Sequence, residues 1–412
     1  MNTVFTSADI LLPENEQART WAVIACDQFS SQPEYWKKVE ELVKDKPSTL
    51  SLILPEALLG TEKGQEHEKQ ISTSMEALLD QRILKEFPHS YIYVERTLQD
   101  GRLRRGLVGA IDLEDYDYHV GSHSVIRATE ATILDRIPPR MAIRKKASLE
   151  LPHILLLADD DRDQLFSKLQ SNTDKLEPLY DFDLMLDGGH LKGWLVDQDH
   201  APLFESSFEG YLKEACNRYD GMGLVVGDGN HSLATAKAIW EEVRLSLSDE
   251  EKENHPARYA LVELESIHEP SLDFEPIHRL LTHVNSDHLK TSIKIALSAK
   301  EGQKGQSITL VDQNGCEDVV LAIDENALAL SWLQPFLDSY LEMFGGSMDF
   351  IHGDDSLKEL AAKENTLGIL LPPISKKGLF EGVVEHGSLP RKTFSMGNAQ
   401  DKRYYMEARK IR

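Results

Sequence analysis

Cysteine is scarce in this sequence, and apolar runs of membrane length are missing. The three cysteines, Cys26, Cys216 and Cys316, lie far apart among 412 residues. They offer neither a disulfide framework nor a CxxC metal knuckle, which suits a reducing cytoplasm. The apolar runs fall well short of the about 20 residues that cross a bilayer, and 1–20 lacks the basic start and apolar run of a signal peptide. We therefore expect a soluble, cytoplasmic protein without a membrane partner.

Familiar catalytic signatures are also absent. The sequence contains no GxxxxGK[ST] phosphate loop, no HExxH zinc motif, no GxSxG nucleophile elbow and no protein-kinase motif set. These absences argue against P-loop NTPases, zinc peptidases, α/β-hydrolases and protein kinases. An enzymatic function would have to come from a less familiar arrangement of residues.

Positive charge is in short supply. The chain has 45 lysines and arginines against 69 acidic residues, for a formal net charge of −24. Broad nucleic-acid binding draws its affinity from Lys and Arg that neutralise phosphates, so this charge argues against a nucleic-acid partner. It leaves room for a local basic pocket that holds a small anionic metabolite. The length and the 41% hydrophobic content are those of a globular protein with two or three domains.

Stretches typical of strands and of helices alternate along most of the chain, which predicts a mixed α/β fold. The predicted strands are 21–25, 91–94, 107–113, 223–226 and 258–264, and the predicted helices begin at 32 and cover 159–170, 203–219, 232–243, 286–298 and 330–344. Residues 301–324 are expected to form a hairpin, and those from 345 onward to be rich in loops. A soft boundary before Ala201 gives an N-terminal α/β domain over 1–200 and a C-terminal α/β domain over 201–412.

The most informative stretch is the turn from Gly227 to Ser232, which follows a short strand and opens a helix. Backbone N–H groups and the positive end of the helix would meet there, which favours an anion site. Asp228, Asn230 and His231 add a carboxylate, an amide and an imidazole, and Ser232 adds a hydroxyl. The alternative is an ordinary Asp-Gly turn with an Asn or Ser helix cap, which needs no ligand.

A dinucleotide-binding turn is a competing interpretation of the same stretch. The pattern Gly227-x-Gly229-x-x-Ser232 lacks the third glycine, and Asp228 would bring the wrong charge to a pyrophosphate. The acidic residue expected about 20 residues further on is not cleanly placed. We therefore disfavour a Rossmann site and keep the turn as a candidate phosphate cradle.

Cations gather upstream of this turn. Five of them lie between Arg136 and Lys146, among them Arg140, in a segment that Pro138-Pro139 stiffens. With Arg127, these guanidinium groups are of the kind that binds phosphate or carboxylate. The alternative is a solvated loop whose charge offsets nearby acids.

Three weaker candidates lie elsewhere. His278 and Arg279 combine a proton carrier with an anion clamp, although a His-Arg pair at the start of a helix is common without any function. Arg391 and Lys392 are placed to close over an anionic ligand, although a basic C-terminal region is often merely exposed. The three acids at 159–161 allow a metal site, but the positive end of a helix dipole explains them more simply.

One set of motifs spans nearly the whole chain and is specific as a set. It consists of 21–28, 47–50 with 54–56, 126–130, 136–140, 226–232, 276–279, 351–353 and 389–397. Two of its members read Ile126-Arg127-Ala128-Thr129-Glu130 and Arg136-Ile137-Pro138-Pro139-Arg140. Together these motifs resemble the bacterial domain-of-unknown-function family ten-fifteen.

This resemblance implies a fold and an activity. The family's usual Asp-Gly-His-His-Arg segment is similar to the phosphate-binding turn of the ParB/sulfiredoxin/free-serine-kinase fold, and the family's genes tend to lie near serine-biosynthesis genes. The resemblance therefore implies a ParB/sulfiredoxin-like core with additional α/β elaborations, and an enzyme that acts on serine or phosphoserine. Asp228, Gly229 and His231 match the usual segment, but Asn230 stands where His is usual and Ser232 where Arg is usual. The anion contact would then depend on other cations.

We therefore expect a small-molecule phosphotransferase, either a serine kinase or a phosphoserine-handling enzyme, that uses Mg²⁺ and a nucleotide or pyrophosphate. Asp228 or His231 would serve as base or metal partner. The expected phosphate and substrate ligands are Gly227, Gly229, Asn230, Ser232, Arg127, Arg136, Arg140, His278, Arg279, Arg391 and Lys392. The alternative is a non-catalytic nucleotide-binding regulatory module of the ParB type.

Overall fold

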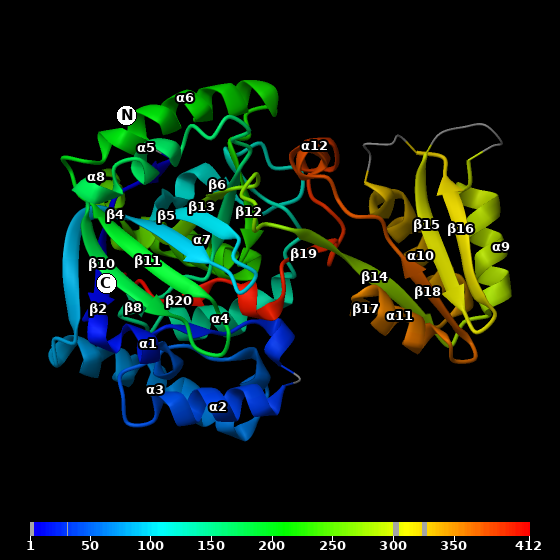
Figure 1. The fold of residues 1–412 in the computed structure, drawn as a ribbon, viewed down its shortest axis with the longest axis horizontal. Helices are drawn as coiled ribbons and strands as arrows, with labels where there is room; N and C mark the ends of the chain where they lie inside the picture. The colour runs from blue at the N-terminus through cyan, green and yellow to red at the C-terminus, as the bar shows by residue number, and fades with distance from the viewer. Residues whose placement is uncertain (1–3, 31, 300–304, 324–327) are drawn as a thin grey trace. The chain divides into compact units, whose positions relative to one another are not determined.

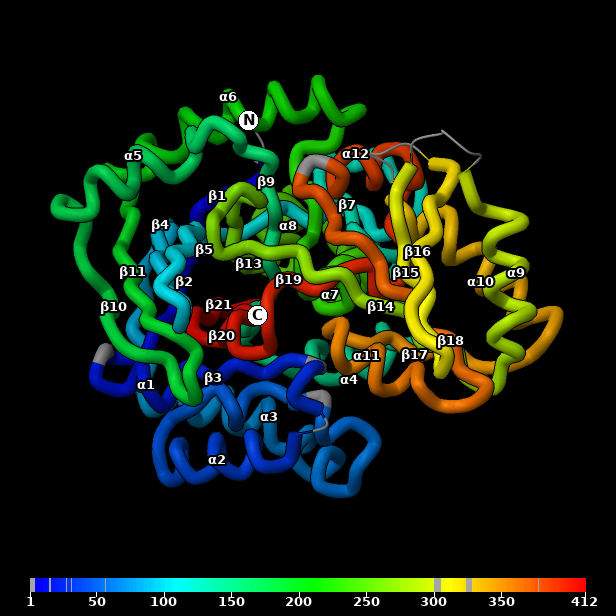
Figure 2. The backbone as a smooth tube through the Cα atoms, turned by 45° about the vertical axis from the view of Figure 1, so that its right-hand side comes forward, coloured from blue at the N-terminus to red at the C-terminus, as the bar shows by residue number. Residues whose placement is uncertain are grey.

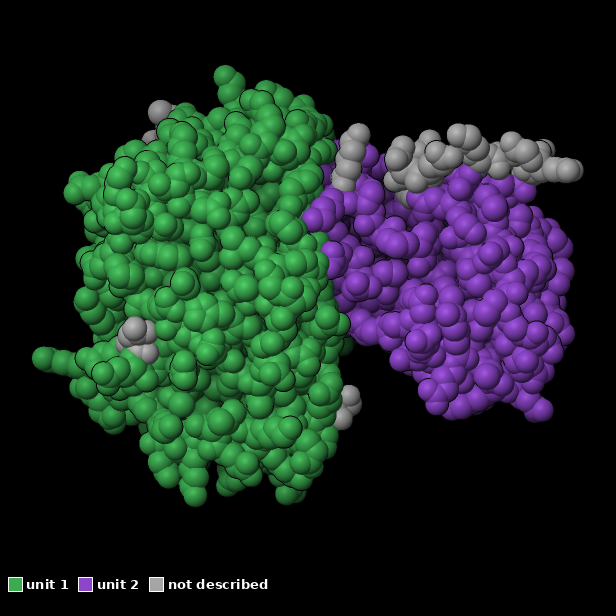
Figure 3. Space-filling model, in the orientation of Figure 1, with its two compact units in different colours: residues 1–272, 397–412 green, residues 273–396 purple. Residues whose placement is uncertain are grey.

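The chain divides into two compact units in a computed structural model that describes residues 4–30, 32–299, 305–323 and 328–412. Unit 1 comprises the residues up to Leu272 together with Gly397–Arg412, and unit 2 comprises Asp273–Met396 (Figure 3). The boundary predicted before Ala201 falls inside unit 1. The reason is that β9 (Leu155–Ala158) and β12 (Leu224–Asp228), on either side of that boundary, pair in one sheet.

Unit 1 is built on an 11-stranded sheet in the order β10-β11-β4-β5-β13-β9-β12-β7-β6, with β1 and β2 paired to β5 and β4. The remaining strands of this sheet are β1 (Phe5–Thr6), β2 (Ala8–Pro13), β4 (Leu84–Thr97), β5 (Leu103–Asp112), β6 (Tyr116–Asp117), β7 (Ile126–Ala128), β10 (Glu177–Asp183), β11 (His190–Val196) and β13 (Tyr259–Ser266). Parallel and antiparallel pairs both occur, since β12 runs parallel to β7 and antiparallel to β9. The predicted mixed α/β class is confirmed.

The helices of unit 1 flank this sheet, with α2 and α3 on one side of the unit and α6 on the other (Figure 1). They are α1 (Ala18–Trp21), α2 (Pro33–Val43), α3 (Glu62–Asp80), α4 (Ile137–Arg144), α5 (Ser167–Gln170), α6 (Pro202–Arg218), α7 (Asn230–Val243) and α8 (Asp249–Asn254). The helix predicted over 159–170 is wrong except for α5. Asp159 and Asp160 are buried just after β9, and a carboxylate oxygen of Asp160 accepts from the backbone N–H of Leu165.

The start of the chain also departs from the predicted strand at 21–25. Helix α1 ends at Trp21, and only β3 (Val23–Ile24) is extended. Trp21 is fully buried, and its indole N–H donates to the carbonyl of Met406, 2.7 Å away. The core of unit 1 therefore includes the C-terminal segment, which packs against the first residues of the chain.

The C-terminal segment, Gly397–Arg412, is a structural part of unit 1 and not an exposed tail (Figure 2). Its strands β20 (Tyr404–Tyr405) and β21 (Arg409–Lys410) pair antiparallel with β3 and with β8 (Leu149–Glu150). The buried guanidinium of Arg96 holds the segment by donating to the backbone carbonyls of residues 400, 401 and 402. These bonds fix the position of the side chains that follow.

Unit 2 is built on a six-stranded sheet in the order β16-β15-β18-β14-β17, with β19 paired to β14. Its elements are β14 (Phe274–Thr282), α9 (Ser286–Leu297), β15 (Gln306–Asp312), β16 (Gly315–Leu321), α10 (Ala329–Phe344), β17 (Ser347–His352), α11 (Asp354–Ala361), β18 (Thr366–Leu370), α12 (Lys376–His386) and β19 (Phe394–Met396). The hairpin predicted over 301–324 is β15–β16, although 301–304 and 324 lie outside the described residues.

Two predictions about unit 2 are wrong. The region after 345 was expected to be rich in loops, but it contains β17, α11, β18 and α12. Its apolar stretches are short and interrupted by glycines, yet their side chains pack together against the sheet of unit 2. His278 and Arg279 lie in the middle of β14 and not at a helix start, because β14 is paired on both sides, with β17 and β18. Among the described residues of both units, no helix is long and apolar enough to cross a bilayer.

Candidate functional site

The turn between β12 and α7 begins the candidate site. Gly229 is the residue before α7 and has a φ of +82°, which a glycine adopts without the strain that a side chain would bring. A Cβ atom there would also lie 2.9 Å from Cγ1 of Ile154. No side chain caps the N-terminus of this 14-residue helix. The positive end of the helix dipole therefore lies at a turn that has no side-chain cap, which favours an anion.

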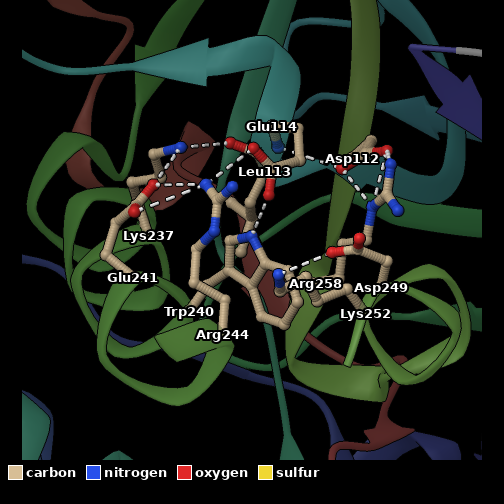
Figure 4. A network of polar contacts seen from close by, with 10 residues as sticks. All are labelled: Asp112, Leu113, Glu114, Lys237, Trp240, Glu241, Arg244, Asp249, Lys252 and Arg258. Atoms are coloured by element: carbon tan, nitrogen blue, oxygen red, sulfur yellow. Dashed lines mark hydrogen bonds and ion pairs between the residues drawn. The ribbon is translucent and has the colours of Figure 1, made fainter. Parts of the chain in front are cut away.

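The opposite end of α7 is fixed by a network of polar contacts (Figure 4). The indole N–H of Trp240 donates to Oε1 of Glu114 at 2.7 Å, and a guanidinium nitrogen of Arg244 lies 2.9 Å from Oε2 of the same residue. Lys237 donates to the carbonyl of Leu113 at 2.8 Å. These contacts attach α7 to the segment after β5, and they thereby restrain the position of the N-terminal turn of the helix.

Asp228 and Lys402 form the charged pair of the site. One carboxylate oxygen of Asp228 accepts from the backbone N–H of Gly229 at 2.8 Å, and the other lies 3.3 Å from Nζ of Lys402. The Lys402 side chain is 11% exposed and that of Asp228 is 33% exposed. The C-terminal segment thus brings a largely buried cation to a turn that lies 174 residues earlier in the sequence.

Two imidazoles lie at this turn. Nε2 of His231 accepts from the backbone N–H of Ile133 at 3.3 Å. Nδ1 of His153 lies 2.7 Å from the hydroxyl of Tyr405, and its Nε2 lies 3.5 Å from the hydroxyl of Ser232. Burial lowers the pKa of His153, and the carboxylate of Asp228 opposes that shift. His153 is therefore a neutral imidazole near pH 7 that can act as a base.

The basic segment and the turn meet in space. The hydroxyl of Thr129 donates to the carbonyl of Val226 at 2.7 Å, and the amide of Asn230 reaches that hydroxyl at 3.4 Å. Helix α4 packs against α7, and the Arg140 side chain on α4 is near enough to His153 to help lower the pKa of that imidazole. The structure therefore brings Arg140 to the same neighbourhood as the turn.

Two other upstream arginines do not join the turn. The guanidinium of Arg127 is buried and donates to the carbonyls of Ser124, at 3.0 Å, and Asp220, at 2.5 Å, so it ties the start of β7 to the loop before β12. Arg136 is exposed at the start of α4, where its carbonyl accepts from the guanidinium of Arg140.

The four downstream candidates belong to unit 2. Arg279 is fully buried and donates to Oε1 of Gln334 and to the carbonyls of residues 277, 391 and 392. His278 is 2% exposed, with its ring nitrogens 2.9 Å from Oδ1 of Asp354 and 3.1 Å from the backbone N of Leu371. Arg391 is exposed and stacks over Phe350. Lys392 offers its carbonyl to Arg279, so this group mainly holds the segment before β19 in place.

The acids at 159–161 do not form a metal site. Within the described parts of the chain, no group of three His, Cys, Asp or Glu side chains is arranged to hold a metal ion. Asp159 instead contacts Nε2 of His268 at 2.6 Å, a guanidinium nitrogen of Arg218 at 3.3 Å and the hydroxyl of Tyr219. The prediction that favoured the helix dipole is also wrong, because α5 begins only at Ser167.

Sequence reasoning missed three residues of the site: His153, Lys402 and Tyr405. His153 stands alone before a short apolar strand, where nothing in the local sequence points to a function. Lys402 and Tyr405 lie in a tail that is basic and rich in tyrosine, and this composition was the one available signal. Their distance from the turn along the chain conceals the contact, which depends on the return of the C-terminal segment into unit 1.

Comparisons with known proteins place the chain in a family. No curated protein matches it. Among solved structures, SbnI with a C-terminal truncation, from Staphylococcus aureus, is 12% identical, with 71% of this chain and 83% of that chain covered and a TM-score of 0.37. Free serine kinase in complex with AMP is 10% identical, with 73% and 91% covered and a TM-score of 0.38. The model of a family described as protein of unknown function matches residues 8–340. The chain therefore belongs to the DUF1015 family.

Proposed function

We propose that this protein is a small-molecule phosphotransferase whose phosphoryl group binds at the N-terminal turn of α7. The observation that carries the proposal is the convergence at that turn of the Asp228–Lys402 pair, His153, His231 and Ser232. These side chains remain partly exposed, with the exception of Lys402, so a ligand can reach them from solvent.

The electrostatics of the turn suit a phosphoryl group. Uncapped backbone N–H groups at a helix N-terminus favour an anion, and phosphoryl transfer depends mainly on positioning and on neutralisation of charge. Lys402 supplies a cation beside Asp228, and Arg140 supplies a second one on α4. We assign the ligand-binding role to these two cations, which lie near the turn, and not to Arg127 or Arg279, which are buried and hold backbone carbonyls of their own units.

Acid–base chemistry has two candidate groups at the turn itself. Asp228 can take the proton of an acceptor hydroxyl. His231 accepts from the backbone N–H of Ile133 through Nε2, so its proton is on Nδ1 and His231 is the candidate proton donor. Asp228 is also the carboxylate that would hold Mg²⁺, an ion that proteins commonly bind through one or two carboxylates together with substrate phosphates. The chemistry that Mg²⁺ would supply there is neutralisation of phosphate charge.

The proposed substrates come from the resemblance and are not tested by the structure. Because the family resemblance implies serine or phosphoserine, we propose serine as acceptor and a nucleotide or pyrophosphate as donor. The enzyme class itself rests on the turn and does not require this choice of acceptor. A protein that binds nucleotide without turnover would instead be a regulatory module.

The experiment is an assay for phosphoserine. Purified protein is incubated with serine, Mg²⁺ and, in turn, ATP, ADP or pyrophosphate, and phosphoserine is measured by ³¹P NMR. We expect product with one donor, and a loss of at least about 100-fold in Asp228→Asn, because its carboxylate charge is removed. Asp199→Asn, at an exposed position before α6, is the matched control and should keep full activity. Nucleotide binding without product, or no effect of Asp228→Asn, would overturn the proposal.

A further inference from the structure

Three side chains that are far apart in the sequence of unit 1 are linked by hydrogen bonds. The hydroxyl of Ser232, in the first turn of α7, lies 3.5 Å from Nε2 of His153, which precedes β9. Nδ1 of the same imidazole lies 2.7 Å from the hydroxyl of Tyr405 in β20. A hydroxyl, an imidazole and a group that orients the imidazole are the parts of an activated nucleophile.

We propose that Ser232 is the first phosphoryl acceptor of this site, that His153 is its general base, and that Tyr405 is a positioning residue. This inference rests on the proposed phosphotransferase function and adds a covalent intermediate to it. The donor is a nucleotide or pyrophosphate, and the phosphoryl group would pass from Ser232 to the final acceptor.

The tautomer of His153 decides its role. If Nδ1 carries the proton and donates it to the oxygen of Tyr405, Nε2 is unprotonated and can accept the proton of Ser232. Burial and the cations of Arg403, Arg140 and Lys402 lower the pKa of His153, which keeps the ring neutral before the reaction. The carboxylate of Asp228 favours the imidazolium form, so it stabilises the ring after proton transfer.

The chemical step balances with these groups. Oγ of Ser232 forms a bond to the phosphorus atom, while the bond from phosphorus to the leaving oxygen of the donor breaks and that oxygen departs with the electron pair. The proton of Oγ moves to Nε2 of His153. When the final acceptor attacks the phosphorus atom, Oγ leaves and takes this proton back from His153. The proton of the acceptor hydroxyl passes to the base that serves the proposed transfer and from that base to water.

The location of Ser232 supports a phosphorylated state. It is the third residue of α7, and a phosphoryl group on its oxygen would lie by the positive end of the helix dipole. Lys402 provides a cation at the same turn through its contact with Asp228.

The test looks for the covalent intermediate in the full chain. The protein is mixed with Mg²⁺ and ATP, ADP or pyrophosphate without serine. The reaction is quenched with acid, which a phosphate ester of serine survives, and the protein is analysed by intact mass and peptide mapping. We expect one added phosphoryl group, on Ser232, that disappears when serine is supplied. Ser232→Ala should abolish the label and lower transfer by at least about 1,000-fold, whereas Ser206→Ala, at an exposed position of α6, should change neither.

The variants of the two supporting residues separate their roles. His153→Gln should slow labelling by about 100-fold or more, because the base is lost. Tyr405→Phe should slow it by about 10-fold and should also move the acid limb of the pH–rate profile to lower pH, since the imidazolium loses a hydrogen-bond acceptor. A purely structural role for Tyr405 would lower the rate without moving that limb.

The outcomes distinguish this inference from the proposed function. If phosphoserine forms but wild-type protein carries no label on Ser232, or Ser232→Ala transfers at the wild-type rate, the covalent intermediate is wrong and the phosphotransferase stands. If the wild-type protein makes no phosphoserine with any of the three donors and acquires no label, both proposals fall.

Discussion

Two groups of polar residues that each contain a histidine, one within β14 and one where β12 meets α7, have different surroundings in this protein. In unit 2, His278 and Arg279 are 2% and 0% exposed, and Arg279 donates hydrogen bonds to three backbone carbonyls and one amide. In unit 1, Asp228, His231 and Ser232 are partly exposed around uncapped backbone N–H groups. The difference favours a structural role for the first cluster and supports the proposal that the second binds a ligand.

The largest effect should come from the buried guanidinium of unit 2. Arg279→Met leaves several carbonyls without a donor, and we expect it to lower the free energy of unfolding by about 3–5 kcal/mol. The control is Arg391→Met, because Arg391 stacks on the same Phe350 ring but is exposed, and it should cost less than about 1 kcal/mol. Urea denaturation measures both. Equal effects of the two variants would show that the carbonyl contacts of Arg279 contribute little.

The next effect concerns activity at the turn. His231→Gln should lower phosphoserine formation by about 100-fold or more, since it removes a candidate proton donor, while changing the free energy of unfolding by less than about 1 kcal/mol. His278→Gln should leave phosphoserine formation nearly unchanged but lower the free energy of unfolding more than His231→Gln does. The reason is that the ring nitrogens of His278 contact Asp354 and the backbone N–H of Leu371. Steady-state kinetics and thermal unfolding of both variants measure these effects. A lower stability of His231→Gln than of His278→Gln would contradict the two roles.

A smaller effect is expected for the glycine that shapes the turn. Gly229→Ala combines a φ of +82° with a Cβ position 2.9 Å from Ile154, and we expect a loss of about 1–2 kcal/mol. Gly101→Ala is the matched control, because its φ is +85° and no atom lies within 4 Å of the added Cβ. It should cost about 1 kcal/mol. If Gly101→Ala lowered the free energy of unfolding more than Gly229→Ala does, the close approach to Ile154 would have no measurable cost.

The smallest effect is a pH dependence of stability in unit 2. Burial lowers the pKa of His278 below the ordinary value of 6.5, while the contact with Asp354 opposes the shift. As the pH falls, His278 therefore binds a proton in the unfolded chain before it does so in the folded protein. The contribution of His278 to stability is fully present above pH 6.5 and is lost as the pH falls through its folded pKa. The slope from this group is at most about 1.4 kcal/mol per pH unit.

Denaturation of His278→Gln between pH 7 and 5 isolates this contribution. The variant should lose part of the slope that the wild-type protein shows below pH 6.5, whereas His283→Gln, at an exposed position after β14, should keep it. A slope that is the same in wild type and His278→Gln would contradict the assignment.

The sequence predicted the turn well because its signals are local. A strand, two glycines and a helix start are adjacent along the chain, and β12, Gly229 and α7 follow them closely. The meeting of the basic segment with the turn was not predictable from spacing, although the parallel pairing of β7 with β12 places Thr129 beside Val226. Pairing between strands about 100 residues apart leaves no mark in either strand's own pattern.

The domain division and the C-terminal contacts could not be predicted for a related reason. Unit 2 is inserted between Leu272 and Gly397, and the chain then returns to complete unit 1. The buried Arg96 that holds this return looks in the sequence like any charged residue of an exposed strand position. Its partners are backbone carbonyls, which every residue carries, so composition gives no sign of them. Lys402 and Tyr405 therefore reach the site without a motif.

One measurement tests the central claim, that the turn of unit 1 carries the activity, most directly. Wild-type protein, His231→Gln and the control His200→Gln, whose ring is held by Asp197 near α6, are assayed side by side for phosphoserine from serine, Mg²⁺ and each donor. We predict equal product from wild type and His200→Gln and at least about 100-fold less from His231→Gln. Full activity in His231→Gln, or no phosphoserine from the wild-type protein with any donor, would contradict the account.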